Sequence, residues 1–124
     1  MITESLMTEK HVKNAHMGNH LLIEVYNVTF DKLNDAKSIK EKCIGACKTE
    51  DLEILNTYTH QFDPYGVTCT ITLAESHLCC HTWPEKQCVA IDIFTCGNKN
   101  PRSVAWWLLK YFDSDDYVMK DYLR

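Results

Sequence analysis

The apolar and polar residues of VTCTITL (67–73) alternate strictly, with threonines between the apolar side chains. A period of two predicts a strand that packs one face into a core and presents hydroxyl groups on the other. Runs rich in branched and aromatic residues predict further strands. These cover residues 20–28, 51–62, 77–83, 87–95 and 117–123. The segment Asp63-Pro64-Tyr65-Gly66 before the alternating strand has the composition of a tight turn.

Two other segments have the spacing of helices. The first covers about residues 31–48, with Asp31 as its expected N-cap. Its recurring apolar positions are Leu33, Ala36, Ile39, Cys43 and Cys47. The second begins at Asn100, a capping residue followed by Pro101, which suits the first helical turn. Its apolar face comprises Val104, Trp107, Leu108 and Tyr111.

The number and order of these elements indicate the fold class. Two helices are too few to cover both faces of a parallel sheet. We therefore expect an α+β fold, a two-layer sandwich with a mostly antiparallel sheet and the helices on one face. The other face would be left for a partner or a substrate. The length of 124 residues suits one domain, so we expect residues 1–124 to form a single unit.

Composition and charge exclude several classes of protein. The net charge is −4 and the 13 basic residues are scattered, so we do not expect nucleic acid as a partner. No apolar run is long enough to span a bilayer, and the N-terminal residues lack a secretory pattern. We expect a cytoplasmic protein without membrane contact and with a frayed tail up to about Gly18. The seven cysteines should then be reduced, and most should be buried.

A serine between two predicted strands is the first candidate for chemistry. Ser76 follows Glu75, and such a serine is ordinarily a turn residue. Alternatively, a strained bond before Ser76 would let its hydroxyl attack the preceding carbonyl and form an ester. Elimination and hydrolysis would then leave a pyruvoyl group at a new N-terminus. A ketone of this kind draws electrons out of a breaking bond, which no standard side chain can do.

The next segment, His77-Leu78-Cys79-Cys80-His81, has the composition of a metal site. Residues 77, 79 and 81 would share one face of a strand and offer two imidazoles and a thiolate to zinc. They would spread over about 13 Å, too far for one ion unless the backbone bends. We expect no metal, and a zinc- or thiol-based binding module remains the alternative function. Cys96, just before Gly97 at a strand end, is either an inert core thiol or a catalytic group held by the sheet.

Four pieces of residues 62–97 together resemble the core signature of the prokaryotic S-adenosylmethionine decarboxylase proenzyme family, in its small pyruvoyl-dependent form. They are PYGVT (64–68), AESH (74–77), HTWPE (81–85) and the A-x-D-x-FTCG ending (90–97). The segment GNHLLIEVYN (18–27) resembles the first strand of the family. The chain departs from the family pattern at Cys69, where glycine is common, and at Cys79 and Cys80.

The resemblance implies that the chain cleaves itself between Glu75 and Ser76 and that Ser76 becomes a pyruvoyl group. Residues 1–75 would form the β chain and residues 76–124 the α chain. The pyruvoyl group would form a Schiff base with S-adenosylmethionine and release CO2, giving decarboxylated S-adenosylmethionine for spermidine synthesis. No pyridoxal phosphate and no metal would be required.

The resemblance also implies roles for individual residues. His81 matches the proton acceptor of processing, Thr68 a hydroxyl that supports that step, and Cys96 the proton donor of decarboxylation. The expected substrate contacts are Phe62, Leu78, Trp83 and Glu85. Phe62 and Trp83 could equally be core residues. A homodimer of αβ units whose sheets meet face to face is also implied, with active sites near the interface. An enzyme-like regulatory subunit that no longer cleaves is a third alternative, which the retained reacting groups disfavour.

Overall fold

The computed structural model describes residues 16–124, so most of the expected N-terminal tail lies outside the described residues. Six strands form one sheet in the order β2-β3-β4-β5-β1-β6, and every neighbouring pair is antiparallel. The strands are β1 Gly18–Val25, β2 Ile54–Gln61, β3 Val67–Leu73, β4 Ser76–Trp83, β5 Cys88–Cys96 and β6 Tyr117–Leu123. The predicted bounds of β3 and β6 are confirmed, and the other strands shift by a few residues.

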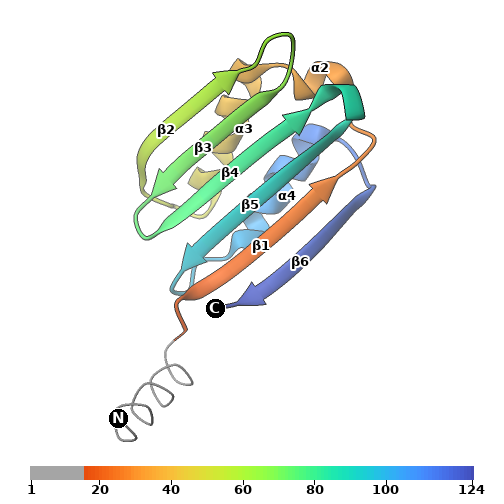
Figure 1. The fold of residues 1–124 in the computed structure, drawn as a ribbon. Helices are drawn as coiled ribbons and strands as arrows, with labels where there is room; N and C mark the ends of the chain where they lie inside the picture. The colour runs from red at the N-terminus through yellow and green to blue at the C-terminus, as the bar shows by residue number, and fades with distance from the viewer. Residues whose placement is uncertain (1–15) are drawn as a thin grey trace, which may run out of the picture.

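The helices lie on one side of this sheet, as the ribbon in Figure 1 shows. They are α2 Phe30–Leu33, α3 Ala36–Thr49 and α4 Pro101–Phe112, with a short 3-10 turn η1 at Pro84–Lys86. The predicted start of α4 is confirmed, since the Asn100 side chain accepts a hydrogen bond from the backbone N–H of Arg102. The expected α+β class with helices on one face is therefore confirmed.

The single helix expected over residues 31–48 is wrong, because the chain breaks between α2 and α3 at Asn34 and Asp35. Asp35 is the N-cap of α3, and its Oδ1 accepts from the backbone N–H of Ser38 at 3.0 Å. Asp31, the expected cap, lies inside the first turn of α2. The apolar spacing continues across the break, so periodicity alone could not reveal it.

The alternation along each strand divides the sheet into a core face and an open face. Fully buried side chains that face the helices include Leu21, Ile23, Ile71, Leu78 and Ile93, which pack against Ile39, Leu108 and Phe112. The opposite face carries the alternate, more polar residues of the strands, and we call it the open face. None of the helices within residues 16–124 covers it (Figure 1).

Replacement of Asp35 by alanine should lower the melting temperature by a few degrees, because α3 loses its capping acceptor. The matched Asp31→Ala variant should melt close to the wild type. The Ser38 N–H holds the pKa of Asp35 below its usual value. The stabilisation is therefore present above the usual carboxyl range and is lost as the pH falls through the lowered pKa. Calorimetry at neutral and acid pH measures both effects, and equal losses in the two variants would contradict the cap.

Candidate active site

The candidate residues gather at two opposite ends of the sheet. Ser76 begins β4 and Cys96 ends β5, and antiparallel pairing brings these two positions to the same end. His81 and Trp83 lie near the other end of β4, where the β2–β3 turn and α2 are found (Figure 1). The site is therefore best described as two half-sites.

The first half-site begins with the turn between β3 and β4. Leu73 pairs with Ser76, which leaves Ala74 and Glu75 as a two-residue turn. Glu75 has a φ of 60°, in the left-handed region. A residue with a Cβ pays about 1 kcal/mol or more for this conformation. Strain of this kind concentrates at functional sites, and here it lies at the residue before Ser76.

Ser76 contacts Cys96 through both the backbone and the side chain. The Cys96 N–H donates to Ser76 Oγ at 3.3 Å, and the Ser76 hydroxyl donates to Cys96 Sγ at 3.7 Å. The Cys96 thiol in turn donates to Glu75 Oε2 at 3.6 Å. Glycine at position 18 permits this arrangement, because a Cβ there would lie 2.0 Å from the Thr95 carbonyl oxygen beside Cys96. The half-site thus places a hydroxyl, a thiol and a carboxylate in one cluster.

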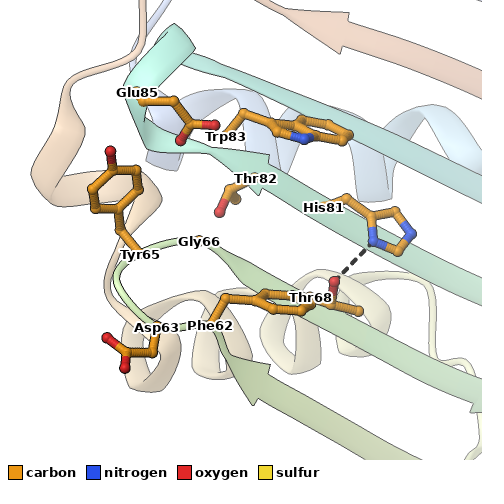
Figure 2. A pocket seen from close by; sticks show the side chains of 9 residues that line it. All are labelled: Phe62, Asp63, Tyr65, Gly66, Thr68, His81, Thr82, Trp83 and Glu85. Atoms are coloured by element: carbon orange, nitrogen blue, oxygen red, sulfur yellow. Dashed lines mark hydrogen bonds between the residues drawn. The ribbon is translucent and has the colours of Figure 1, made fainter.

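The second half-site is a hollow of about 460 Å³, drawn in Figure 2. Its lining residues are Phe62, Asp63, Tyr65, Gly66, Thr68, His81, Thr82, Trp83 and Glu85. Thr68 Oγ1 and His81 Nδ1 are 3.0 Å apart and belong to directly paired positions of β3 and β4. The hollow therefore combines an imidazole oriented by a hydroxyl with aromatic surfaces and two carboxylates.

The break between α2 and α3 supports the wall of this hollow. The Asn34 side-chain oxygen accepts from the Gly66 N–H and from Gln61 Nε2, each at 2.9 Å. Thr82 Oγ1 donates to the Leu33 carbonyl at 2.6 Å. Gly66 has a φ of 115°, which a residue with a Cβ rarely adopts, so glycine is required at this turn.

One chain does not bring the two half-sites together. Ser76 and His81 are five residues apart in the continuous strand β4, a separation of about 16 Å along the strand. Phe62 is 47% exposed and Trp83 is 39% exposed in the hollow, so the alternative that they are core residues is wrong. Leu78 faces the helices and is fully buried, so its side chain contributes packing and is not carried forward as a substrate contact.

The metal hypothesis for the His77–His81 segment is not supported by the geometry. Cys80 is buried in the core, while Cys79 and the two histidines remain spread along the strand. Burial raises the pKa of the Cys79 thiol, and the Asp92 carboxylate raises it further. Within residues 16–124, the one group of ligand atoms close enough to share an ion is His20, His77 and Asp92.

Sequence reasoning assigned no role to His20 or Asp92. Both occupy open-face positions, and strand alternation could have indicated that shared face. It could not have indicated their contact, because that depends on the pairing of β1 with β5.

Comparison with known proteins gives consistent results. A family model described as S-adenosylmethionine decarboxylase matches residues 19–124. The S-adenosylmethionine decarboxylase proenzyme of Persephonella marina is 39% identical over 104 residues, covering 84% of this chain and 71% of that protein. The proenzyme of Moorella thermoacetica is 40% identical over 101 residues, covering 81% of both chains. The crystal structure of the adenosylmethionine decarboxylase from Aquifex aeolicus has a TM-score of 0.81 at 28% identity, over 88% of this chain and 91% of that one.

The chain also offers no helix, within the part that the structure describes, with the length and apolar character needed to cross a bilayer.

Alkylation of the native protein should distinguish the exposed thiols from the core thiols. Cys96 and Cys88 are partly exposed, whereas Cys43, Cys47, Cys69 and Cys80 are fully buried. Burial raises the pKa of Cys47 to about 12, so this thiol is protonated at neutral pH. Iodoacetamide should label Cys96 and Cys88 at least tenfold faster than the four core thiols, measured by peptide mass spectrometry. Equal rates in native and unfolded protein for the core thiols would contradict this structure.

Proposed function

Because the chain belongs to the S-adenosylmethionine decarboxylase family, we propose that Ser76 and Cys96 are the reacting groups of its decarboxylation site. The activity is that of an S-adenosylmethionine decarboxylase proenzyme, a pyruvoyl-dependent carboxy-lyase that forms decarboxylated S-adenosylmethionine. The resemblance predicted from the sequence is confirmed. The observation that carries the residue assignment is the contact of Ser76 with Cys96 beside the strained Glu75.

Self-cleavage follows from the chemistry of Ser76 and its neighbours. Ser76 Oγ attacks the carbonyl carbon of Glu75, a C–O bond forms, the C–N bond breaks, and the chain is joined by an ester. Loss of the α-proton of residue 76 then breaks its Cβ–Oγ bond. This step releases Glu75 with a new C-terminal carboxylate on its main chain. Hydrolysis of the remaining unsaturated amine releases ammonia and leaves a ketone. The left-handed Glu75 favours the attack because opening the turn relieves its strain.

The residues around position 76 fit a pyruvoyl group. The Cys96 N–H, which donates to Ser76 Oγ before cleavage, would be a hydrogen-bond donor beside the ketone that forms on the α-carbon of residue 76. The group supplies an electron sink for the pair released when CO2 leaves. Cys96 lies 3.7 Å from Ser76 Oγ through its sulfur, so the thiol is placed to protonate the substrate carbon that has lost CO2.

The hollow at the other end of the sheet is the proposed binding site for S-adenosylmethionine. The exposed rings of Phe62 and Trp83 suit the sulfonium cation and the adenine, through cation–π attraction and stacking. Glu85 offers a carboxylate to the ribose hydroxyls. His81, oriented by Thr68, is the proposed proton acceptor during processing.

A homodimer with shared sites reconciles these roles with the distance between the half-sites. Cys96, Thr68 and His81 occupy open-face positions of their strands, and Ser76 is about 16 Å along β4 from His81. A two-fold axis that lies between two facing open faces, parallel to the sheets and perpendicular to β4, makes each end of one sheet meet the opposite end of the other. Ser76 and Cys96 of one protomer would then face Thr68 and His81 of its partner, twice per dimer.

Intact mass spectrometry under denaturing conditions tests the cleavage chemistry. The wild type should give fragments 1–75 and 76–124, the second lighter by one ammonia than a chain that begins with serine. Ser76→Ala should give one uncleaved chain, because the attacking hydroxyl is gone. Cys96→Ala should be cleaved but should lose about 100-fold or more in kcat, the range for a positioned general acid. Cys88→Ala is the matched thiol control on the same strand and should keep both properties. Cleavage of Ser76→Ala would place the reacting residue elsewhere.

Complementation between two inactive variants tests the shared site. Ser76→Ala and His81→Ala should each remain uncleaved when expressed alone. When they are co-expressed with different tags, the His81→Ala chain should be cleaved, because its Ser76 meets an intact His81 of the partner. Random pairing would yield about a quarter of the wild-type sites. An uncleaved His81→Ala chain in a verified mixed dimer would contradict sharing, and cleavage of that variant alone would contradict the role of His81.

A further inference from the structure

Three open-face side chains without a role in the proposed chemistry meet beside residue 76. They are His20 from β1, His77 from β4 and Asp92 from β5. Asp92 Oδ1 accepts a hydrogen bond from His20 Nε2, and Asp92 Oδ2 lies 3.4 Å from His77 Nε2. Because His77 directly follows Ser76, this carboxylate connects the start of β4 to its neighbour strands.

Contacts between aromatic rings hold the side chains of this cluster in place. The rings of His20 and His77 meet edge to face with centroids 5.8 Å apart. The Phe94 ring lies against both, at 5.7 Å from His20 and 5.9 Å from His77. The Arg124 guanidinium covers that ring at 5.3 Å from its centroid. Contacts therefore run from the end of β6 through β1 and β5 to the residue after Ser76.

Arg124 also indicates which nitrogen of His20 carries the proton. Its Nη1 lies 3.4 Å from His20 Nδ1, and a guanidinium can only donate. We therefore assign Nδ1 as the acceptor, so Nε2 carries the hydrogen that is donated to Asp92. The ligand atoms of His20, His77 and Asp92 lie within 4.8 Å of one another and could also hold a divalent metal. A metal on Nε2 would move the proton to Nδ1, where it would face the guanidinium donor, so the hydrogen-bonded state is favoured.

Cleavage changes what holds residue 76 in place. In the uncleaved chain the Ala74-Glu75 turn connects it covalently to β3. After cleavage residue 76 is a chain end, and chain ends lose order unless they are tied down. Misplacement of a reacting group by 1 Å can cost about 100-fold in rate. The nearest side-chain anchor on the cleaved strand is His77, with its contacts to Asp92, His20 and Phe94.

We propose that Asp92, oriented by His20, is a positioning residue that holds His77 and so keeps residue 76 against Cys96 after cleavage. This inference rests on the proposed function, since it concerns the cleaved chain. Asp92 acts through His77 and is not itself a reacting group. Its effect is specific to the new chain end, which separates it from a general contribution to stability.

Hydrogen exchange tests the anchor without any measurement of turnover. Asp92→Asn is compared with its parent in two states, the self-cleaved protein and the uncleaved Ser76→Ala background. The amides of residues 77–79 should exchange about tenfold faster in the cleaved variant and nearly unchanged in the uncleaved one. Asp121→Asn is the matched control, because this carboxylate of β6 pairs with Arg102 of the helix α4 at 2.9 Å and takes its ion pair from the helix side of the sheet. No acceleration, or the same acceleration in both states, would overturn the proposal.

Kinetics provides the second readout. Asp92→Asn should be cleaved normally, and its kcat should fall about 10- to 100-fold while KM stays within about twofold. When residue 76 is displaced, the proton should more often go to the α-carbon of residue 76 and less often to the substrate carbon that has lost CO2. That event transfers the substrate amino group to residue 76, leaving alanine there and an aldehyde in the product. Intact mass should therefore show more alanine-ended chain per turnover. His20 contacts Asp92 Oδ1, whereas His77 lies near Oδ2. His20→Gln should shift all these values in the same direction.

The outcomes separate the two proposals. An uncleaved or inactive wild type would reject the proposed function and its residue assignment. A normal wild type with unchanged kcat and alanine yield in both variants would reject the positioning role alone. One tightly held metal ion per chain, lost in Asp92→Asn, would overturn the hydrogen-bonded cluster in favour of a metal site.

Discussion

The antiparallel register between β4 and β5 is the constraint on which the rest of the site depends. His77 pairs with Phe94 and Cys79 with Asp92, so the start of β4 lies beside the end of β5. This register lets Ser76 contact Cys96 and lets His77 reach Asp92, which lies two residues before its direct partner Phe94. A slip by one residue would turn every side chain of β4 to the other face, exposing Leu78 and burying His77 and His81. The burial of the helix-facing residues of β4 therefore fixes which side chains of this strand lie on the open face.

The core that fixes this register consists of the helix-facing side chains. Leu78 and Cys80 of β4 and Ile93 of β5 are fully buried, and Ile91 of β5 is almost fully buried. Their position under α3 and α4 makes a change of register costly, because it would expose apolar area at about 25 cal/mol per Å². The departures at Cys69 and Cys80 from the family pattern fall on this side. They change packing, and they leave the reacting groups in place.

Most of the fold could be predicted from the sequence because alternation and helical spacing are strong local signals. β3 has strict alternation, and α4 begins at a capping residue followed by proline. The break at Asn34 and Asp35 could not be predicted, because apolar spacing continues through it. Its purpose is visible only in three dimensions, where Asn34 bonds to Gly66 across the fold.

Some features of the candidate site could also be predicted from the sequence, and others could not. The contact of Ser76 with Cys96 agrees with the roles that the resemblance implies, and the distance of His81 follows from counting residues along a strand. The burial of Leu78 was also available from alternation, since it shares parity with Cys80. The contact of His20 with Asp92 was not available, because 72 residues separate them and only the order β5-β1-β6 makes them neighbours.

The place of β4 within the sheet explains how one strand can serve both cleavage and catalysis. It pairs with β3 on one edge and β5 on the other, so opening the turn at Glu75 removes a covalent link and leaves both ladders. The strand is then held everywhere except at its first residue. That residue is the one that must be released from the turn for the chemistry and yet remain fixed to within a fraction of an ångström afterwards. Backbone pairing alone cannot meet both demands at a chain end, and a side-chain anchor on the next residue can.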